Sequence, residues 1–426
     1  MEIYRNPERK DWAALCARPS DFNPVVKERV ERIIDRVRTE GDAALLGLAK
    51  EIDGLDMESL AVSEAEIVEA SALVEDKVKL AIADAARNIT AFHKAQYPAQ
   101  VEVETAPGVR CIQRPVPIRS VGLYIPGGTA PLFSTVLMLA IPAAIAGCSE
   151  VVLCTPCARN GKVAPAVLYA ASYCGIRKIY KVGGAQAVAA MAYGTESVPR
   201  VDKIFGPGNQ YVTTAKQLLG NRQVAIDMPA GPSEVMVMAD STANAAYVAA
   251  DLLSQAEHGA DSQVMLVSDS DKLASEVEAE VLRQAELLSR ADFVAKSLQK
   301  SRFVVLDSRE EMLAFANEYA SEHLIISMEN PWEIADRITA AGSVFIGNYT
   351  PESAGDYASG TNHTLPTCGW ARSCSGVNLD SFMKKMTIQE ISRDGLEGLA
   401  KTIVSMAEAE GLQAHANAVK IRTYEK

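Results

Sequence analysis

Hydrophobic positions change their spacing along the chain, and this change separates a helical beginning from an α/β body. Apolar residues recur three or four positions apart over 23–50 and again over 63–97, which predicts amphipathic helices. From Ser120 the pattern changes to short β-branched runs (SVGLYI, EVVLC, KIYKV, VDKIF) separated by Ala-rich stretches. This alternation is typical of a parallel sheet with crossover helices, so we expect a first α/β unit over 120–232.

The same alternation begins again after the turn-rich segment DMPAGPSE. A helix is expected over about 241–257, and the strand-like runs are EVMVMA, QVMLVS, FVVL, LIIS and SVFIG. Two successive α/β sets indicate an internal duplication, although no residue-by-residue repeat accompanies them. From about Asp380 the pattern predicts no further strands and a helical tail broken near Gly411. A tail of this kind often docks on a partner subunit.

Length and charge limit the classes of protein to consider. The 426 residues exceed the roughly 250–300 that one hydrophobic core supports, so at least two domains are expected. The formal net charge of −12 would repel a phosphate backbone, which argues against a nucleic-acid partner. The longest apolar run, Val136 to Cys148, is shorter than the roughly 20 residues that cross a bilayer. We therefore expect a buried helix there, and no membrane partner.

The N-terminus and the cysteines indicate a cytoplasmic protein. Charges occupy the positions where a secretory signal needs an apolar stretch. Eight cysteines without a dense spacing pattern suit a reducing compartment. Cys154 and Cys157 form the one CxxC, and we interpret them as ordinary cysteines at the end of a strand because no second CxxC accompanies them.

Histidine marks a candidate metal site. The chain has only five histidines, and four of them lie in its second half. Gln255 and His258 are three residues apart at the end of an expected helix, so both side chains leave one face, as two ligands of one metal do. Spacing alone does not separate this interpretation from an exposed helix end. Further ligands would have to come from elsewhere, and Asp356 and His415 are the candidates, with His363 in the same loop as Asp356.

An acid and an imidazole are adjacent in SEHLII, at Glu322 and His323, immediately before an expected strand. A neutral histidine can take a hydroxyl proton near neutral pH, and a glutamate can orient or deprotonate a water molecule. The two residues are therefore candidates for acid–base catalysis. A solvated Glu–His pair gives the same sequence pattern.

Glycine-rich turns after two expected strands are the candidates for binding a dinucleotide. The chain contains no G-x-G-x-x-G, but VGGAQAVAAM follows KIYKV, and FGPGNQYV follows VDKI. Glycines between a strand and a helix either admit a pyrophosphate at the helix N-terminus or form tight turns. Tyr124, in YIPGG, is a candidate for stacking or hydrogen bonding in the same region.

Taken together, these segments resemble the histidinol dehydrogenase family. The resemblance runs from about residue 118 to 420 in the family's order and rests on SVGLYIPGGTAPLFSTVLMLA, VGGAQAVAA, VDKIFGPGNQYV, DMPAGPSEV, DLLSQAEHG, SEHLII, PESAGDYASGTNHTLPT and AEGLQAHANAV. It implies an α/β fold of two Rossmann-like parallel-sheet domains with small helical N- and C-terminal extensions. The implied activity is the NAD-dependent, four-electron oxidation of L-histidinol to L-histidine through L-histidinaldehyde, in histidine biosynthesis.

A division into domains goes with this resemblance. We expect a larger α/β domain, which carries most of the metal and catalytic residues, from 20–122 and 233–377. A second, NAD-binding α/β domain is expected over 123–232. The helical parts are a small domain from 1–19 and 378–404, and a tail at 405–426 that reaches the partner subunit.

The resemblance also implies a role for each candidate residue. One Zn²⁺ per subunit is held by Gln255, His258, Asp356 and His415, and His415 comes from the other subunit of a domain-swapped homodimer. Two NAD⁺ are used per turnover, and the implied NAD contacts are Tyr124, Gln186 and Asn209. Glu322 and His323 are the implied acid–base pair. The implied substrate contacts are Ser233, Gln255, His258, Glu322, His323, Asp356, His363, Glu410 and His415.

Two other functions fit parts of the pattern. A related zinc- and NAD-dependent dehydrogenase would oxidise another small alcohol, such as a sulfonated diol. A zinc hydrolase would use Glu322 as its base and would form no NADH. His363 and Glu410 are both present, and in the family they face the amino-acid-like substrate, which favours histidinol over a diol.

Overall fold

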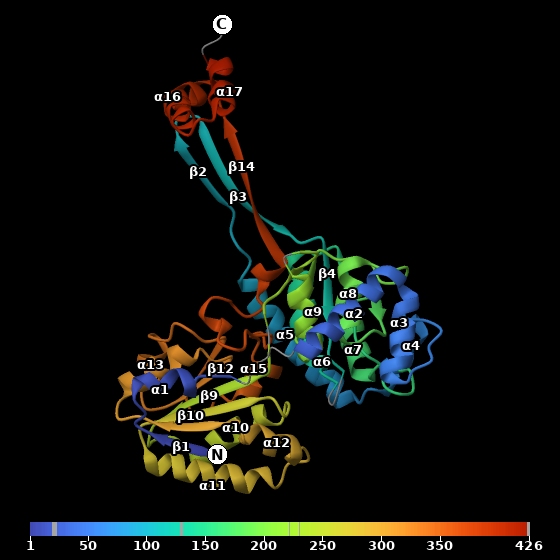
Figure 1. The fold of residues 1–426 in the computed structure, drawn as a ribbon, viewed down its shortest axis with the longest axis vertical. Helices are drawn as coiled ribbons and strands as arrows, with labels where there is room; N and C mark the ends of the chain where they lie inside the picture. Colours follow the sequence, from blue (N-terminus) through green and yellow to red (C-terminus); the bar gives the residue numbers. More distant parts are fainter. Residues whose placement is uncertain (19–23, 128–130, 221, 230, 424–426) are drawn as a thin grey trace.

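Two parallel sheets and a projecting arm organise the chain in the computed structural model, which describes residues 1–18, 24–127, 131–220, 222–229 and 231–423 (Figure 1). Sheet B has the order β6-β5-β4-β7-β8. Its strands are β4 (Ser120–Tyr124), β5 (Glu150–Cys154), β6 (Lys178–Tyr180), β7 (Lys203–Phe205) and β8 (Ala225–Ile226). Sheet A has the order β1-β11-β10-β9-β12-β13. Its strands are β1 (Glu2–Arg5), β9 (Glu234–Ala239), β10 (Gln263–Ser268), β11 (Arg302–Val305), β12 (His323–Ser327) and β13 (Ser343–Ile346).

The two sheets share one topology. Numbered along the chain, the strands β4–β8 and β9–β13 both take the order 3-2-1-4-5, and β1 is added at the outer edge of sheet A. All neighbouring strands in both sheets are parallel. The expected α/β class and the expected strand runs are therefore confirmed. The common order agrees with the duplication that the hydrophobic pattern indicates.

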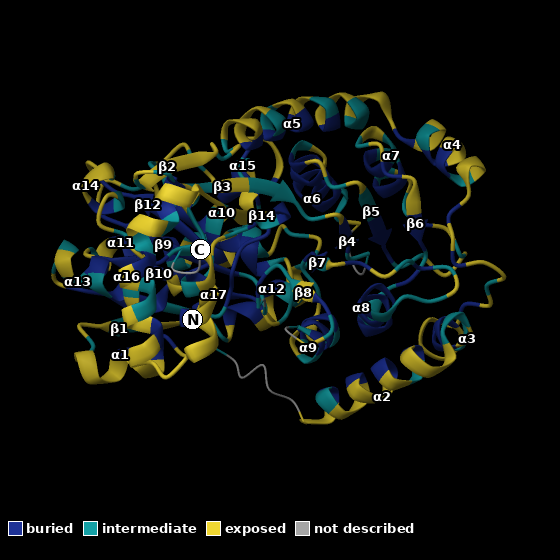
Figure 2. Cartoon of the chain, turned by 90° about the horizontal axis from the view of Figure 1, so that it is seen from above, coloured by how far each residue is buried: buried dark blue, intermediate teal, exposed yellow. Residues whose placement is uncertain are grey.

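Helices cover both faces of each sheet, as parallel sheets require. On sheet B, one face carries α4 (Glu64–Leu73), α5 (Asp76–Ala95), α6 (Phe133–Ala146) and α7 (Pro165–Tyr173). The other face carries α2 (Pro24–Glu40), α3 (Asp42–Leu48), α8 (Gly184–Tyr193) and α9 (Gln210–Leu219). On sheet A, α10 (Ala245–Ala256), α11 (Asp271–Ala285) and α12 (Ala291–Leu298) lie opposite α1 (Arg9–Leu15), α13 (Arg309–Tyr319) and α14 (Trp332–Ala335). Figure 2 shows α2 and α5 with buried inner and exposed outer faces.

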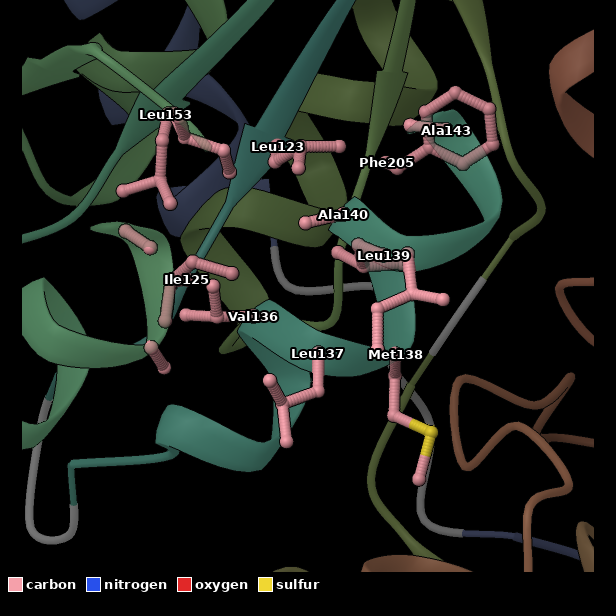
Figure 3. Packing of buried hydrophobic residues seen from close by; sticks show 14 of the residues in the cluster. Leu123, Ile125, Val136, Leu137, Met138, Leu139, Ala140, Ala143, Leu153 and Phe205 are labelled. Carbon is pink, nitrogen blue, oxygen red and sulfur yellow. The ribbon is translucent and has the colours of Figure 1, made fainter. Parts of the chain in front are cut away.

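The central strands are continuous apolar runs because they bury side chains on both faces. In β9, Val235 and Val237 join the cluster under α10, whereas Met236 and Met238 join the cluster on the opposite face. This is the two-residue alternation of an extended chain. Helix α6 is buried almost all round, which confirms the expected buried helix. Its Ala140 lies beside Leu123 of β4, and its Val136 lies beside Ile125 (Figure 3). Within the described residues, no helix combines the length and apolarity needed to cross a membrane.

The arm is an antiparallel ribbon that carries two helices at its end (Figure 1). Its order is β14-β3-β2, formed by β2 (Val101–Ala106), β3 (Val109–Pro117) and β14 (Met383–Ile391). Helices α16 (Arg393–Ala409) and α17 (Gln413–Thr423) pack together beyond it, and the expected break at Gly411 is confirmed. The expectation that strands stop near Asp380 is wrong. β14 is largely exposed, so it has no buried face whose periodicity would predict a strand.

The expected domain boundaries remain a prediction, and the packing of the described residues can be compared with them. In the expected helical unit of 1–19 and 378–404, β1 pairs with β11 and α1 buries Trp12 against sheet A. Within 20–122, α2 packs in the core of sheet B. The boundary between 404 and 405 falls inside α16. The short, half-exposed β1 gave no pattern that would have indicated these contacts.

Candidate active site at the amino edge of sheet A

Strands β9 and β12 begin at the same edge of sheet A, and the candidate catalytic residues gather there. β9 starts at Glu234, directly after Ser233, and β12 starts at His323, directly after Glu322. Helix α10 follows β9 and returns to this edge, so Gln255 lies in its last turn and His258 just beyond it. Helix α15 (Glu352–Tyr357), which carries Asp356, packs against α10. The expected position of Glu322 and His323 at the start of a strand is confirmed.

Three side chains at this edge have the arrangement of a metal site. The ligand atoms of His258, Glu352 and Asp356 all lie within 4.8 Å of one another. The amide of Gln255 is buried beside Glu352. When the amide nitrogen faces the Glu352 carboxylate, it donates to both carboxylate oxygens, to Oε2 at 3.3 Å and to Oε1 at a shorter distance. The amide oxygen is then directed away from Glu352. The imidazole and carboxylate donors of this cluster are ligand types that Zn²⁺ accepts.

The acid and the base are both buried and held by one main-chain segment. The Glu234 amide N–H donates to Glu322 Oε2 at 2.8 Å, and His323 Nδ1 lies 3.1 Å from the Glu234 carbonyl oxygen. A carbonyl only accepts, so Nδ1 carries the proton. Nε2 of His323 has no hydrogen-bond partner among the described residues and lies 3.7 Å from Asp356 Oδ1. In the neutral ring, Nε2 is the nitrogen that can accept a proton.

Electrostatics at this edge favour a bound cation. Burial raises the pKa of Glu322 to about 8. Burial alone would lower the pKa of His323, but the carboxylates of Glu352 and Glu322 outweigh it and raise that pKa to about 10. Burial also raises the pKa of Glu352 well above its usual value. A cation beside Asp356 and Glu352 would neutralise part of this negative charge and bring the pKa of His323 down toward neutrality.

His363 connects this edge to sheet B. Its Nδ1 donates to the Asp356 carbonyl oxygen at 2.9 Å, and its Nε2 lies 3.1 Å from Thr135 Oγ1. Thr135 is in the first turn of α6, directly after β4 and its following loop. The neighbouring Asn362 donates to the Met138 carbonyl oxygen of the same helix at 2.6 Å. The amino edge of sheet A therefore lies against the carboxyl edge of sheet B.

The residues expected to contact NAD⁺ all lie at the carboxyl edge of sheet B. Tyr124 ends β4, and its hydroxyl accepts from the Gly184 N–H at 3.1 Å, where α8 begins. Gln186 is buried in the first turn of α8. Asn209 caps α9, because its Oδ1 accepts from the N–H groups of Tyr211 (3.0 Å) and Val212 (3.2 Å). In parallel sheets, dinucleotides bind at the helix N-termini of this edge. The positions of the three residues are consistent with that site, and their contacts with NAD⁺ remain a prediction.

A glycine is required where the chain leaves β7. Gly206 has φ +126°, and a Cβ there would lie 2.1 Å from the Tyr124 carbonyl oxygen. Its amide N–H donates to Asp227 Oδ2 at 2.8 Å. The buried pair of Lys216 and Asp227 then holds this turn, because Lys216 Nζ also donates to the Gly206 carbonyl oxygen at 2.9 Å. The sequence FGPG thus forms a tight turn, held by these contacts, ahead of Asn209.

Two candidate residues are not brought to the site within one subunit. Glu410 and His415 are exposed, and they lie with α16 and α17 at the far end of the arm (Figure 1). Their expected contribution to a neighbouring subunit's site remains a prediction. Conversely, sequence reasoning missed Glu352 and Thr135. Glu352 had a usable signal, since it precedes Asp356 by four residues and therefore shares its helix face.

The chain is similar to known proteins along nearly its whole length. The family model described as histidinol dehydrogenase matches residues 16–423. The histidinol dehydrogenase of Bacteroides thetaiotaomicron is 55% identical over 422 residues, covering 99% of both chains, and that of Vibrio vulnificus is 55% identical over 423 residues, covering 99% of this chain and 97% of the relative. The crystal structure of histidinol dehydrogenase from Elizabethkingia anophelis superposes with a TM-score of 0.96 at 51% identity, covering 99% of this chain and 98% of that one. The chain belongs to the histidinol dehydrogenase family.

Proposed function

We propose that this protein oxidises L-histidinol to L-histidine through L-histidinaldehyde, as an NAD-dependent, cytoplasmic enzyme of histidine biosynthesis. Full-length similarity to relatives named histidinol dehydrogenase supports the substrate. The observation that carries the chemistry is the buried pair of Glu322 and His323 beside the cluster of His258, Glu352 and Asp356. An enzyme that oxidises an alcohol through the aldehyde to the carboxylic acid needs one base for the hydroxyl proton and one base for the attacking water. Glu322 and His323 are two such groups at this edge.

The proposed metal ligands are Gln255, His258 and Asp356, with His415 from a second subunit. When bound, Zn²⁺ would hold the substrate's imidazole and amine and so fix the position of the reacting carbon, while NAD⁺ provides the hydride acceptor. The spacing of His258 and Asp356 supports their part in this assignment. Glu352 is placed to orient the Gln255 amide.

His323 and Glu322 divide the proton transfers. In the first oxidation, His323 Nε2 takes the hydroxyl proton, because Nδ1 is held by the Glu234 carbonyl. In the second, Glu322 deprotonates the water that attacks the aldehyde. His323, once it has released its first proton, takes a proton from the resulting hydrate as the second hydride leaves for NAD⁺. Burial of both side chains keeps bulk water from competing for these protons.

Substrate contacts are proposed for Ser233, which lies beside Glu234, and for His363, with Glu410 and His415 from the second subunit. The arm supports a domain-swapped homodimer, because it extends away from its own body (Figure 1) and leaves apolar side chains uncovered. The exposed apolar residues of the arm and its helices include Val101, Val103, Met386, Ile391, Met406, Leu412 and Ile421. A second subunit would bury them.

The experiment follows NADH absorbance after the protein is mixed with NAD⁺ and either histidinol or a sulfonated diol. We expect two NADH per histidinol, no NADH from the diol, loss of turnover with a chelator, and recovery with Zn²⁺. NADH from the diol alone would identify the related dehydrogenase instead, and no NADH from any alcohol would favour the hydrolase. The family match and the geometry of two proton acceptors argue against both.

A further inference from the structure

A buried ion pair joins the N-terminal segment to Glu234, the residue whose main chain binds Glu322 and His323. Arg18, which follows α1, donates from Nε to Glu234 Oε1 at 3.1 Å and from Nη2 to Glu234 Oε2 at 2.8 Å. The two side chains are 11% and 2% exposed, so the contact is shielded from solvent. The guanidinium also donates to the Tyr319 carbonyl oxygen at 2.7 Å and lies 3.7 Å from the centre of the Tyr319 ring.

Glu234 is held from a second direction as well. The amide N–H of Cys368 donates to Glu234 Oε1 at 2.5 Å. Both carboxylate oxygens are therefore fixed, and the first residue of β9 has little freedom to rotate. A planar guanidinium matches a carboxylate with two parallel hydrogen bonds, whereas an ammonium group makes a single-point contact. Replacing Arg18 by lysine would keep the charge and lose this geometry.

The main chain of Glu234 carries both groups of the proposed chemistry. Its N–H binds the carboxylate of Glu322, and its carbonyl oxygen binds Nδ1 of His323. The pairing of β9 with β12 begins one residue later, at Val235 and His323. Glu234 also pairs with Gln263 of β10, so the N–H and carbonyl oxygen that meet Glu322 and His323 belong to a residue held in the sheet. A small rotation of Glu234 would move the acid and the base together.

We propose that Arg18 is a positioning residue, which acts through Glu234 to fix the orientation of Glu322 and His323 without touching the substrate. The inference rests on the proposed roles of those two residues. A buried ion pair gains little net stability, because desolvation offsets the attraction. What distinguishes this pair from a structural contact is that the main chain of Glu234 forms the hydrogen bonds to Glu322 and His323.

The test compares Arg18→Lys with Arg302→Lys. Arg302 is the matched control, because it holds the same N-terminal segment through the carbonyl oxygens of Ala14 (3.0 Å), Leu15 and Ala17 (3.4 Å), and within the described residues it makes no hydrogen bond or ion pair with Glu234. For Arg18→Lys we expect kcat to fall about 10- to 100-fold, with the KM values for histidinol and NAD⁺ within about twofold of wild type. Oxidation of histidinol and of histidinaldehyde should slow together, since both use His323.

Two results would overturn the proposal: an equal fall of kcat in both variants, or a rise in KM at unchanged kcat. Melting temperature and zinc content are measured on each variant, and Glu234→Gln provides the same kinetic comparison if Arg18→Lys does not fold. Failure of the proposed function is distinguishable, because wild-type protein would then not oxidise histidinol at all. If wild type is active and Arg18→Lys behaves like Arg302→Lys, only the positioning role is wrong.

Discussion

The two sheets have the same strand order, yet the edges that face each other are built from different chemistry. The amino edge of sheet A concentrates titratable side chains, with Glu322, His323, Glu352 and Asp356 all buried. The carboxyl edge of sheet B consists of helix N-termini and turns in which main-chain N–H groups and one glycine set the shape. One topology therefore supplies the proposed proton-transfer and metal-binding groups on one side and the proposed cofactor site on the other. Substitutions at the first edge should change the rate of chemistry, and those at the second should change cofactor binding.

The largest expected effect is at the edge of sheet A. His323→Asn should lower kcat by about 10²- to 10⁴-fold in both oxidation steps, because it removes the base common to them. Glu322→Gln should slow oxidation of histidinaldehyde far more than oxidation of histidinol. Stopped-flow measurement of NADH from each substrate separates the two steps. Equal losses in both steps for Glu322→Gln would contradict the division of labour.

A smaller effect concerns the pH dependence of the second step. Burial raises the pKa of Glu322 to about 8, so the carboxylate that activates water is mostly protonated at pH 7. Oxidation of histidinaldehyde should therefore rise by about tenfold per pH unit below 8 and level off above it. Rates measured between about pH 6.5 and 9 should lose this rise in Glu322→Gln. A variant that retains the wild-type slope would show that another group titrates.

At the edge of sheet B, Gly206→Ala should act on the cofactor. Its Cβ would lie 2.1 Å from the Tyr124 carbonyl oxygen at a φ of +126°, so the turn must move. We expect a loss of about 1–3 kcal/mol of stability and a severalfold rise in KM for NAD⁺, with a smaller change in kcat. Gly175→Ala is the control, because Gly175 also has a positive φ, of +78°, but no neighbouring atom within 4 Å. A rise in KM for NAD⁺ in Gly175→Ala as large as that in Gly206→Ala would remove the link to the cofactor edge.

Strands and helices with a buried face were predictable, whereas exposed elements were not. β4 and β9 are continuous apolar runs because both of their faces are covered, so the sequence pattern alone located them. β2 and β14 lie in the exposed arm, and β1 is a short edge strand, so none of them shows the burial pattern on which such a prediction depends.

The site was predictable where a motif marks it and unpredictable where only the fold creates it. Gln255 and His258 share a helix end, and Glu322 and His323 are adjacent, so local pattern and family resemblance together named them. The contact between Arg18 and Glu234 joins residues 216 apart in the chain, and the contact between Thr135 and His363 joins residues 228 apart. Nothing in local sequence indicates which distant side chains a fold will bring together.

The central claim is that the metal site at the edge of sheet A is completed by His415 of a second subunit. Complementation tests it most directly: His258→Ala and His415→Ala proteins are each inactive, and they are then mixed by unfolding and refolding together. Random pairing makes about half of the dimers mixed, and each mixed dimer contains one intact site, so about a quarter of wild-type activity should return. A mixture no more active than either variant alone, from dimers shown to exchange subunits, would contradict the account.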